Sequence, residues 1–372
     1  MRSPALAARH LLPLLRDAQH ARTMQLADWD DTIRLTRQAR LLGMLAHRLR
    51  DDEDLWAFLH ERVRGHLQAA IHYSAYRVQL VRMEMRALDA ALPADRPVAL
   101  LKGAGYLVQG LAMARGRMPN DVDLLVRRAD LDAAEAALRS AGWQMEAKTD
   151  YDERYYREWS HELPPMRYPG HALEVDLHHT IAPVTSRTRA DDALLFDGLQ
   201  SVPGSRFRVL DPCDQVIHAA IHLFQDSDLH GQLRGLVDVD GLIRHHLGDN
   251  AQVWSRLIDR AERHRADRVL WYALHYCRSW LGTPVPEGLA LGPPPRWARH
   301  GMDWVFSRAC PPRIPDATPS LGERLADTLG ELRYHRLRMP PTLLARHLLH
   351  KSWKAVRPRK QFPRPPGGEG QG

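Results

Sequence analysis

The chain has 372 residues, and because a single hydrophobic core usually stops growing before this length, two or three compact units are expected. A composition of 44% hydrophobic and 26% charged residues excludes a disordered or fibrous protein. The net charge of +7 permits contact with nucleotides or nucleic acid. Much of that excess lies in the C-terminal tail, so nucleic acid is not the favoured partner.

The sequence predicts a cytoplasmic protein rather than a membrane protein. No stretch is apolar for long enough to cross a bilayer. At the N-terminus, Arg9, His10 and Arg16 interrupt the apolar run that a signal peptide needs, so this segment is interpreted as a first helix. The three cysteines lie far apart without a metal-ligand spacing and are interpreted as buried thiols.

The first part of the chain predicts helices. Between Leu55 and Leu92, apolar residues recur at steps of three and four, with arginines on the intervening faces. Pro97 then ends this pattern, because proline cannot continue a helix. We therefore expect an N-terminal helical region over residues 1–95.

The pattern changes to a mixture of strands and helix over residues 96–185. Short apolar or alternating runs predict three strands, at 98–101, 121–126 and 172–179. The sequence KGAG directly follows the first strand and opens a helix. Between the second and third strands, residues 129–143 show a helical pattern with acidic residues in the first turn and Gly142 at the end. These elements outline a small α/β unit.

The chain becomes helical again from Asp211. Asp211 and Pro212 supply an N-cap and a proline at the first helical position, and later helical patterns end at glycines. We expect a C-terminal helical region over residues 186–350. The remaining segment, 351–372, is basic and rich in proline and glycine, which is typical of a disordered tail.

Two aspartates, Asp121 and Asp123, open the second predicted strand. Because side chains two apart on a strand point to the same face, the carboxylates repel unless they share a proton, have an arginine neighbour or bind a divalent cation. Such a pair is also common in solvated turns. The cation is favoured because the pair precedes a buried strand and because Asp176, on another strand, can reach the same ion. Upstream, Lys102 and Gly103 offer an ammonium and backbone amides to phosphates.

These residue types suit phosphoryl chemistry. Mg²⁺ takes oxygen ligands and completes its shell with nucleotide phosphates, and two ions about 4 Å apart can activate an attacking oxygen and stabilise departing pyrophosphate. In this scheme Asp121 and Asp123 hold both ions, and Asp176 binds the ion at the attacking hydroxyl. Mn²⁺ is an alternative metal. Arg117 would neutralise phosphate charge. Two further candidates share the face of Asp176, namely Glu174 and His178.

The motifs LKGAGYL, GRMPNDVDLLVRRADLDAAEAALRSAGW and LEVDLHHTI resemble the nucleotidyltransferase superfamily that includes DNA polymerase beta. Over residues 25–285 the chain resembles, more narrowly, the bacterial uncharacterised nucleotidyltransferase family. The resemblance implies an α+β fold, with a small mixed-sheet core between helical regions. It also implies a metal-binding set and a phosphate turn, formed by Asp121, Asp123 and Asp176 and by Lys102 and Gly103. The superfamily turn is usually Gly-Ser, whereas Ala104 follows Gly103 here.

The resemblance implies transfer of a nucleoside monophosphate from a nucleoside triphosphate to a hydroxyl acceptor, with release of pyrophosphate, and fixes no acceptor. A catalytically inactive nucleotide-binding or scaffold protein on the same fold is the alternative, because a fold alone does not establish activity. A dinucleotide-binding fold is less favoured, since Gly110 comes two positions too late for the G-x-G-x-x-G pattern.

Other polar residues have simpler interpretations. His218 and His222, four apart on a helix, are interpreted as core or surface residues, because no third metal ligand is evident. Arg234 and Asp238 are interpreted as an intrahelical ion pair. Residues 150–165, an aromatic run followed by HELPP, are a candidate loop on the substrate side.

Overall fold

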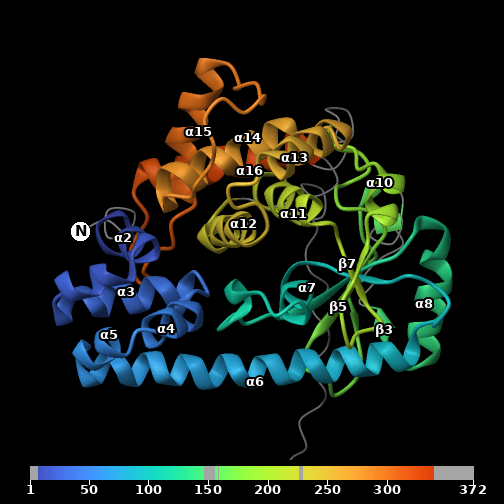
Figure 1. The fold of residues 1–372 in the computed structure, drawn as a ribbon, viewed down its shortest axis with the longest axis horizontal. Coiled ribbons are helices and arrows are strands. Elements are labelled where there is room, and N and C mark those ends of the chain that lie inside the picture. Colours follow the sequence, from blue (N-terminus) through green and yellow to red (C-terminus); the bar gives the residue numbers. More distant parts are fainter. Residues whose placement is uncertain (1–6, 146–155, 158, 226–228, 339–372) are drawn as a thin grey trace, which may run out of the picture.

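The computed structural model describes residues 7–145, 156–157, 159–225 and 229–338, in which one mixed sheet lies among helices from both ends of the chain (Figure 1). The predicted α+β class is therefore confirmed. The predicted disordered tail lies outside the described residues, as does most of the aromatic segment 150–159. Within the described part, no helix has the length and apolar character needed to cross a membrane.

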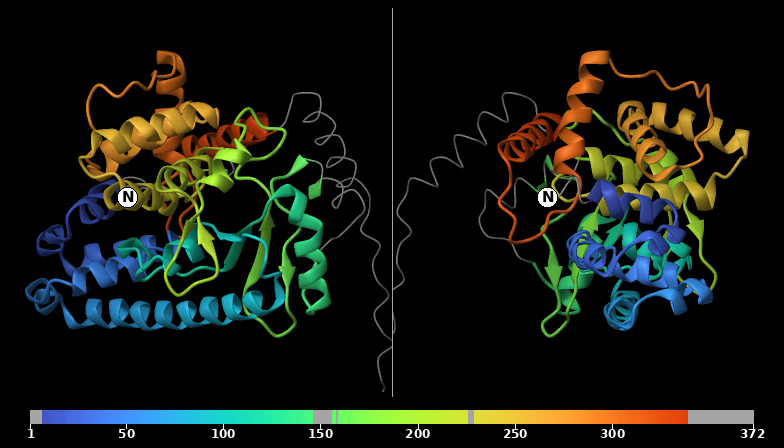
Figure 2. Two further views of the ribbon diagram at one scale, coloured as in Figure 1. Left: turned by 45° about the vertical axis from the view of Figure 1, so that its right-hand side comes forward. Right: turned by 90° about the vertical axis from the view of Figure 1, so that its left-hand side faces the viewer.

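The N-terminal region is helical, as predicted. Its elements are the π-helical turn η1 (Ala7–Leu11), α2 (Leu12–Arg16), the 3-10 turn η2 (Ala18–Thr23), α3 (Leu26–Gln38), α4 (Leu42–Arg50), α5 (Glu53–Phe58) and α6 (Glu61–Ala91). Helix α6 has 31 residues, which corresponds to a length of about 46 Å. It extends along the base of the molecule from the N-terminal helices to the sheet (Figures 1 and 2).

Helix α6 joins two hydrophobic cores. Its buried residues Val63 and Leu67 pack with α3, α4 and α5, whereas Val81 and Leu88 pack with the sheet. The spacing of these residues in the sequence reflects one continuous buried face. Helix α6 is therefore a rigid link between the N-terminal helices and the sheet.

The sheet has seven strands in the order β3-β4-β5-β2-β1-β7-β6. They are β1 (Ala99–Leu100), β2 (Asp121–Leu125), β3 (Gln144–Met145), β4 (Met166–Arg167), β5 (Glu174–His178), β6 (Gln200–Ser201) and β7 (Arg208–Val209). Strands β2 and β5 are parallel neighbours, and β1 is antiparallel to β2. The sheet continues past the predicted end at residue 185, because β7 pairs with the free side of β1.

The two faces of the sheet have different partners. Val122 and Leu124 of β2 pack in the core that contains α6 and α8 (Leu131–Ser140), while Leu125 packs in the core of the C-terminal helices. Between β1 and β2 come α7 (Lys102–Val108) and the 3-10 turn η3 (Ala112–Ala114), and the 3-10 turn η4 (Arg128–Asp130) precedes α8. Gly105 allows α7 to approach β1, because a Cβ there would lie 2.7 Å from the Leu100 carbonyl oxygen.

The C-terminal region covers the second face of the sheet. After α10 (Asp192–Asp197), its elements are α11 (Pro212–Phe224), α12 (Leu233–His246), α13 (Ala251–Arg263), α14 (Asp267–Tyr276), the π-helical turn η5 (Cys277–Leu281), α15 (Arg296–Ala309) and α16 (Leu321–Arg338). Helix α11 begins as predicted, since the Asp211 side chain accepts a hydrogen bond from the Cys213 backbone N–H at 2.8 Å.

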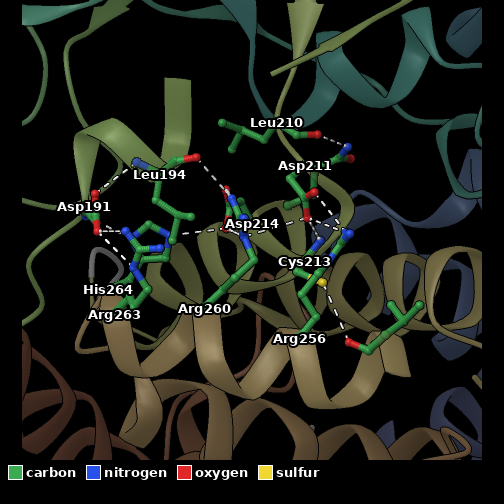
Figure 3. Close-up of polar contacts among 12 residues, drawn as sticks. Asp191, Leu194, Leu210, Asp211, Cys213, Asp214, Arg256, Arg260, Arg263 and His264 are labelled. Atoms are coloured by element: carbon green, nitrogen blue, oxygen red, sulfur yellow. Dashed lines mark hydrogen bonds and ion pairs between the residues drawn. The ribbon is translucent and has the colours of Figure 1, made fainter. Parts of the chain in front are cut away.

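A polar network fixes α11 against α13 (Figure 3). Asp214 of α11 is fully buried, and its Oδ1 accepts from Arg260 Nε at 2.6 Å and contacts His264 Nε2 at 3.2 Å. One turn earlier, Asp211 accepts from Arg256 at 2.9 Å. Because each buried carboxylate has a cationic or hydrogen-bonding partner, the network can sit inside the fold without an uncompensated charge. It sets the position of α11 over the second face of the sheet.

Candidate active site

The parallel pairing of β2 with β5 brings the predicted carboxylates together. Asp123 is the register partner of Asp176, and Asp121 is the register partner of Glu174. Register partners on adjacent strands point to the same face, so these four side chains project from the face of the sheet that α11 covers. Their roles as metal ligands stay predictions, but the proximity expected from the alternation of the two strands is present.

Asp123 carries the negative charge of the site. It is 3% exposed, and its Oδ1 accepts from Lys102 Nζ at 3.0 Å and contacts His178 Nε2 at 3.1 Å. Burial opposes ionisation of Asp123, but the Lys102 ammonium and the His178 ring outweigh it and hold the pKa of this carboxyl well below its usual range. Asp123 is therefore ionised, and its carboxylate oxygens can act as ligands to a cation.

Asp176 and Asp121 have the opposite electrostatic environment. Burial, reinforced by the charge of Asp123, raises the pKa of Asp176 to about 9 and also raises the pKa of Asp121. Asp176 Oδ1 is buried without a hydrogen-bond partner. Lys102 forms an ion pair with Asp123, Arg234 and Arg117 act on Asp121 from a greater distance, and one oxygen of Asp176 is unsatisfied. This donor set fits hard divalent cations, which take oxygen ligands.

The turn at Lys102 and Gly103 directs its lysine to the carboxylates. Lys102 has φ +43°, in the left-handed region that L-residues with side chains rarely adopt, and its ammonium reaches Asp123. A Cβ on Gly103 would lie 3.2 Å from Arg117 Nε, so glycine permits this close packing. Ala104 is buried in the core shared with α6, so the position of the superfamily serine faces the interior of the protein.

Arg117 lies beside the carboxylates but is engaged by a neighbour. It is 7% exposed, and its Nη1 donates to Asp238 Oδ1 of α12. The predicted ion pair between Arg234 and Asp238 is therefore wrong, because Asp238 is taken by an arginine from the loop before β2. Nη1 of Arg234 is buried without a hydrogen-bond partner, and burial lowers the pKa of Arg234 to about 10. The expected contact of Arg117 with phosphate stays a prediction.

The remaining predicted candidates lie at the borders of the carboxylate group. Glu174 accepts from Arg167 and is half-buried at the outer end of β5. His178 is fully buried and contacts Glu162 as well as Asp123, at 3.3 Å and 3.1 Å. Glu162 belongs to HELPP, which pairs alongside β5 through the hydrogen bond from Leu163 N to Leu177 O at 2.9 Å. HELPP therefore lies next to the carboxylates.

A cavity and a larger cleft meet at Asp121. The cavity, about 80 Å³, is lined by residues of α7, the loop before β2, β2, α11 and α12, including Lys102, Gly103, Arg117 and Asp123. The cleft, about 610 Å³, extends from Asp121 between the turn after α3, the start of α12 and the segment 312–319. His222 lines both spaces, whereas His218 is buried behind Lys102.

The cleft contains residues that sequence reasoning missed. Arg40 comes from the turn between α3 and α4, Gln232 and Arg234 come from the start of α12, and Arg313 follows α15. No motif connects these positions, since they come from three separate parts of the chain. The arginines among them gather beside Asp121 only in the folded protein.

Comparison with known proteins identifies the family. The family model described as "Uncharacterised nucleotidyltransferase" matches residues 25–282, from the start of α3 to the end of η5. No curated protein matches the chain. Among solved structures, the crystal structure of JHP933 from Helicobacter pylori is similar, with 12% identity, a TM-score of 0.30, and coverage of 76% of this chain and 97% of that one. Because the family model spans more than half of its length, the chain belongs to the uncharacterised nucleotidyltransferase family.

Proposed function

We propose that this chain transfers a nucleoside monophosphate from a nucleoside triphosphate to a hydroxyl group, using two Mg²⁺ ions held by Asp121, Asp123 and Asp176. Membership of the family supports nucleotidyl transfer in general. The observation that carries the finer proposal is the lateral pairing of Asp123 with Asp176, whose Oδ1 is buried and unsatisfied. When bound, the two ions would supply positive charge at the attacking and leaving oxygens. Mn²⁺ has the same ligand preference and is the alternative metal.

The protein residues have distinct parts in this reaction. Lys102 and His178 fix the orientation of the Asp123 carboxylate and keep it ionised. Asp121, at the boundary between the cavity and the cleft, faces the donor nucleotide. Asp176, ionised when the cations are bound, would hold the ion at the acceptor hydroxyl and so lower the pKa of that hydroxyl, whose proton would pass to water. The hydroxyl oxygen then forms a bond to the α-phosphorus, the bond from that phosphorus to the bridging oxygen breaks, and pyrophosphate leaves with the electron pair.

The proposal is tested by incubating the purified chain with Mg²⁺, nucleoside triphosphates labelled at the α-phosphate, and sets of sugars, small metabolites, proteins and RNA as acceptors. We expect label transfer by the wild type and none above background for Asp121→Asn and Asp123→Asn, which should still fold. Asp176→Asn should lower the turnover number more than nucleotide affinity. Glu174→Gln is the matched control, since Glu174 shares the face but pairs with Arg167.

Two outcomes would contradict the proposal. Full turnover by both Asp121→Asn and Asp123→Asn would exclude the metal assignment. The absence of transfer with every acceptor, combined with Mg²⁺-dependent thermal stabilisation by ATP, would favour a nucleotide-binding protein without turnover. A scaffold protein should show neither transfer nor stabilisation.

A further inference from the structure

We infer that Arg234 and Arg40 bind the triphosphate tail of the donor nucleotide, in the cleft that opens from Asp121 between the start of α12 and the turn after α3. The inference rests on the proposed function, because it specifies where the phosphates of that donor lie. Neither arginine belongs to a recognised sequence motif. Both are placed in the cleft by the packing of helices from opposite ends of the chain.

Arg234 has a buried hydrogen-bond donor to which an anionic ligand could bind. It is the second residue of α12, and its Nη1 is buried without a hydrogen-bond partner. Asp238, one turn later and the acceptor expected for it, is bound by Arg117 instead. A buried guanidinium N–H that finds no acceptor destabilises the folded protein, so the position is best explained by a ligand that supplies oxygen atoms.

Arg40 faces the same cleft from the other side. It is exposed and has φ +56° at the C-terminal end of α3, where the Leu41 N–H donates to the Thr36 carbonyl oxygen at 2.8 Å and closes the helix. Arg40 has no ion pair with a described residue. Arg313, the third arginine of the cleft, is neutralised by Asp327 at 2.7 Å. Arg40 and Arg234 are therefore the arginines of the cleft whose charges lack an acidic partner in the described chain.

The position and size of the cleft favour a compact polyanion. Its volume of about 610 Å³ is within the range of small-ligand sites, and Asp121 forms its border with the cavity that contains Asp123. A phosphate chain that begins at the carboxylates would therefore extend toward Arg234 and Arg40. Helices and the segment 312–319 enclose the cleft on several sides, which suits a nucleotide tail better than a nucleic-acid strand.

The turn at Lys102 and Gly103 lacks a side-chain hydroxyl for phosphate, so other residues must bind the triphosphate. In place of the superfamily serine, Ala104 is buried in the sheet core and offers no hydroxyl to a phosphate. The Lys102 ammonium is bonded to Asp123, and Arg117 is bonded to Asp238. A triphosphate carries several negative charges, and guanidinium groups bind phosphate oxygens through paired, charge-assisted hydrogen bonds. Arg234 and Arg40 can supply this recognition.

Inorganic tripolyphosphate is the direct probe, because it has the phosphates of the donor without its base. We expect calorimetric titration of the full chain in Mg²⁺ to show binding that Arg234→Gln weakens by about tenfold to a hundredfold, with a similar or smaller loss for Arg40→Asn. Arg265→Asn is the matched control for Arg40. Arg265 is also exposed with a left-handed backbone, φ +52°, but does not line the cleft, and asparagine tolerates this conformation.

Thermal unfolding separates ligand binding from a structural role. Arg234→Gln should unfold at the same temperature as the wild type or higher, because an unsatisfied buried charge is removed, whereas loss of a structural arginine would lower the melting temperature. No binding of tripolyphosphate to the wild type, or equal binding to Arg234→Gln, Arg40→Asn and the wild type, would overturn the inference.

The arginine assignment and the proposed transferase function can be tested independently of each other. If the wild type transfers nucleotide and both arginine variants do so equally well at donor concentrations below saturation, the arginine assignment is wrong and the transferase proposal stands. If tripolyphosphate binding needs both arginines but no acceptor is ever modified, the transferase proposal is wrong and the polyanion site stands.

Discussion

Asp123 and Asp176 have the same side chain and lie next to each other, but their environments shift their pKa values in opposite directions. Lys102 and His178 stabilise the charge of Asp123, while burial and the surrounding carboxylates favour the neutral form of Asp176. Pairs of carboxyl groups whose pKa values are driven apart are typical of sites that bind cations or transfer protons. The alternation of β2 and β5 predicted that the two side chains share a face. The difference in charge could not be predicted, because it depends on residues from other elements.

Arg234 shows why contacts between helices escape sequence reasoning. An arginine four residues before an aspartate favours an intrahelical pair, but such exposed pairs contribute only about 0.2–0.5 kcal/mol. Arg117 reaches Asp238 from 121 residues away and forms a largely buried pair with it. The weak local pair between Arg234 and Asp238 is replaced by a stronger tertiary pair between Arg117 and Asp238. The sequence around Asp238 does not indicate that Arg117 lies nearby.

Two glycines provide a test at the level of single residues. Gly43 of α4 touches the backbone of Gly116, and a Cβ on Gly43 would overlap the Gly116 carbonyl oxygen. Because neither backbone can yield as a flexible side chain would, we expect Gly43→Ala to lower the free energy of unfolding by about 1–3 kcal/mol. Urea denaturation measures the change.

Gly65 is the matched control for Gly43. It is exposed in the second turn of α6, and a methyl group added to its Cα would meet no other atom within 4 Å. Gly65→Ala should therefore stabilise the protein by about 0.5–1 kcal/mol, through helix propensity alone. Equal stability changes for the two variants would show that α4 and the loop before β2 are not in backbone contact.

Among secondary-structure elements, the long amphipathic helices were predictable and two of the short strands were not. Helices α6, α8, α11 and α12 have an amphipathic period over ten or more residues, and each was predicted. Strands β6 and β7 have two residues each, too few for alternation to be visible, and they were assigned to the helical region. β7 pairs with the free side of β1, and β6 pairs with β7, so their place in the sheet depends on contacts with strands far away in the sequence.

The polar network under α11 provides a test at the level of elements. Asp214 is fully buried between Arg260 and His264, so Asp214→Asn would leave the Arg260 guanidinium with only the more distant Asp211 carboxylate, 3.8 Å away. We expect a loss of about 3–5 kcal/mol in the free energy of unfolding. Arg263→Ala breaks the more exposed pair with Asp191 and should cost less than about 1 kcal/mol.

Chemical denaturation of both variants separates the two kinds of ion pair. A loss below about 1 kcal/mol for Asp214→Asn would mean that solvent reaches this network and screens it, as it does at surface pairs. The position of α11 over the carboxylates would then depend on apolar packing alone.

In the whole molecule, the hydrophobic cores cross the boundaries expected from the sequence. The core of the C-terminal helices includes Leu11 and Leu41 from the N-terminal region and Leu125 from β2. The cleft likewise combines Arg40, Asp121 and Arg234 from three regions. Composition and hydrophobic periodicity predict where the regions lie along the chain. They do not predict which residues of different regions pack in the same hydrophobic core.

This sharing predicts that the sheet unit does not fold alone. A fragment of residues 96–209 keeps all seven strands but loses α6 from one face and α11 from the other. We expect it to show no cooperative thermal transition by circular dichroism, because both faces would expose apolar side chains to water. A sharp transition for the fragment, comparable with that of the full chain, would contradict this interpretation.

Helix α6 has a consequence for how relatives of this protein can vary in length. Each added helical residue turns everything before it by about 100° and moves it by about 1.5 Å. One extra residue between Leu67 and Val81 would therefore swing Arg40 around the helix axis and away from Asp121. Seven extra residues would nearly restore the angle but separate the two by about a further 10 Å. Helix α6 therefore fixes both the distance and the rotation between the two sides of the cleft. Insertions in relatives are expected outside this helix.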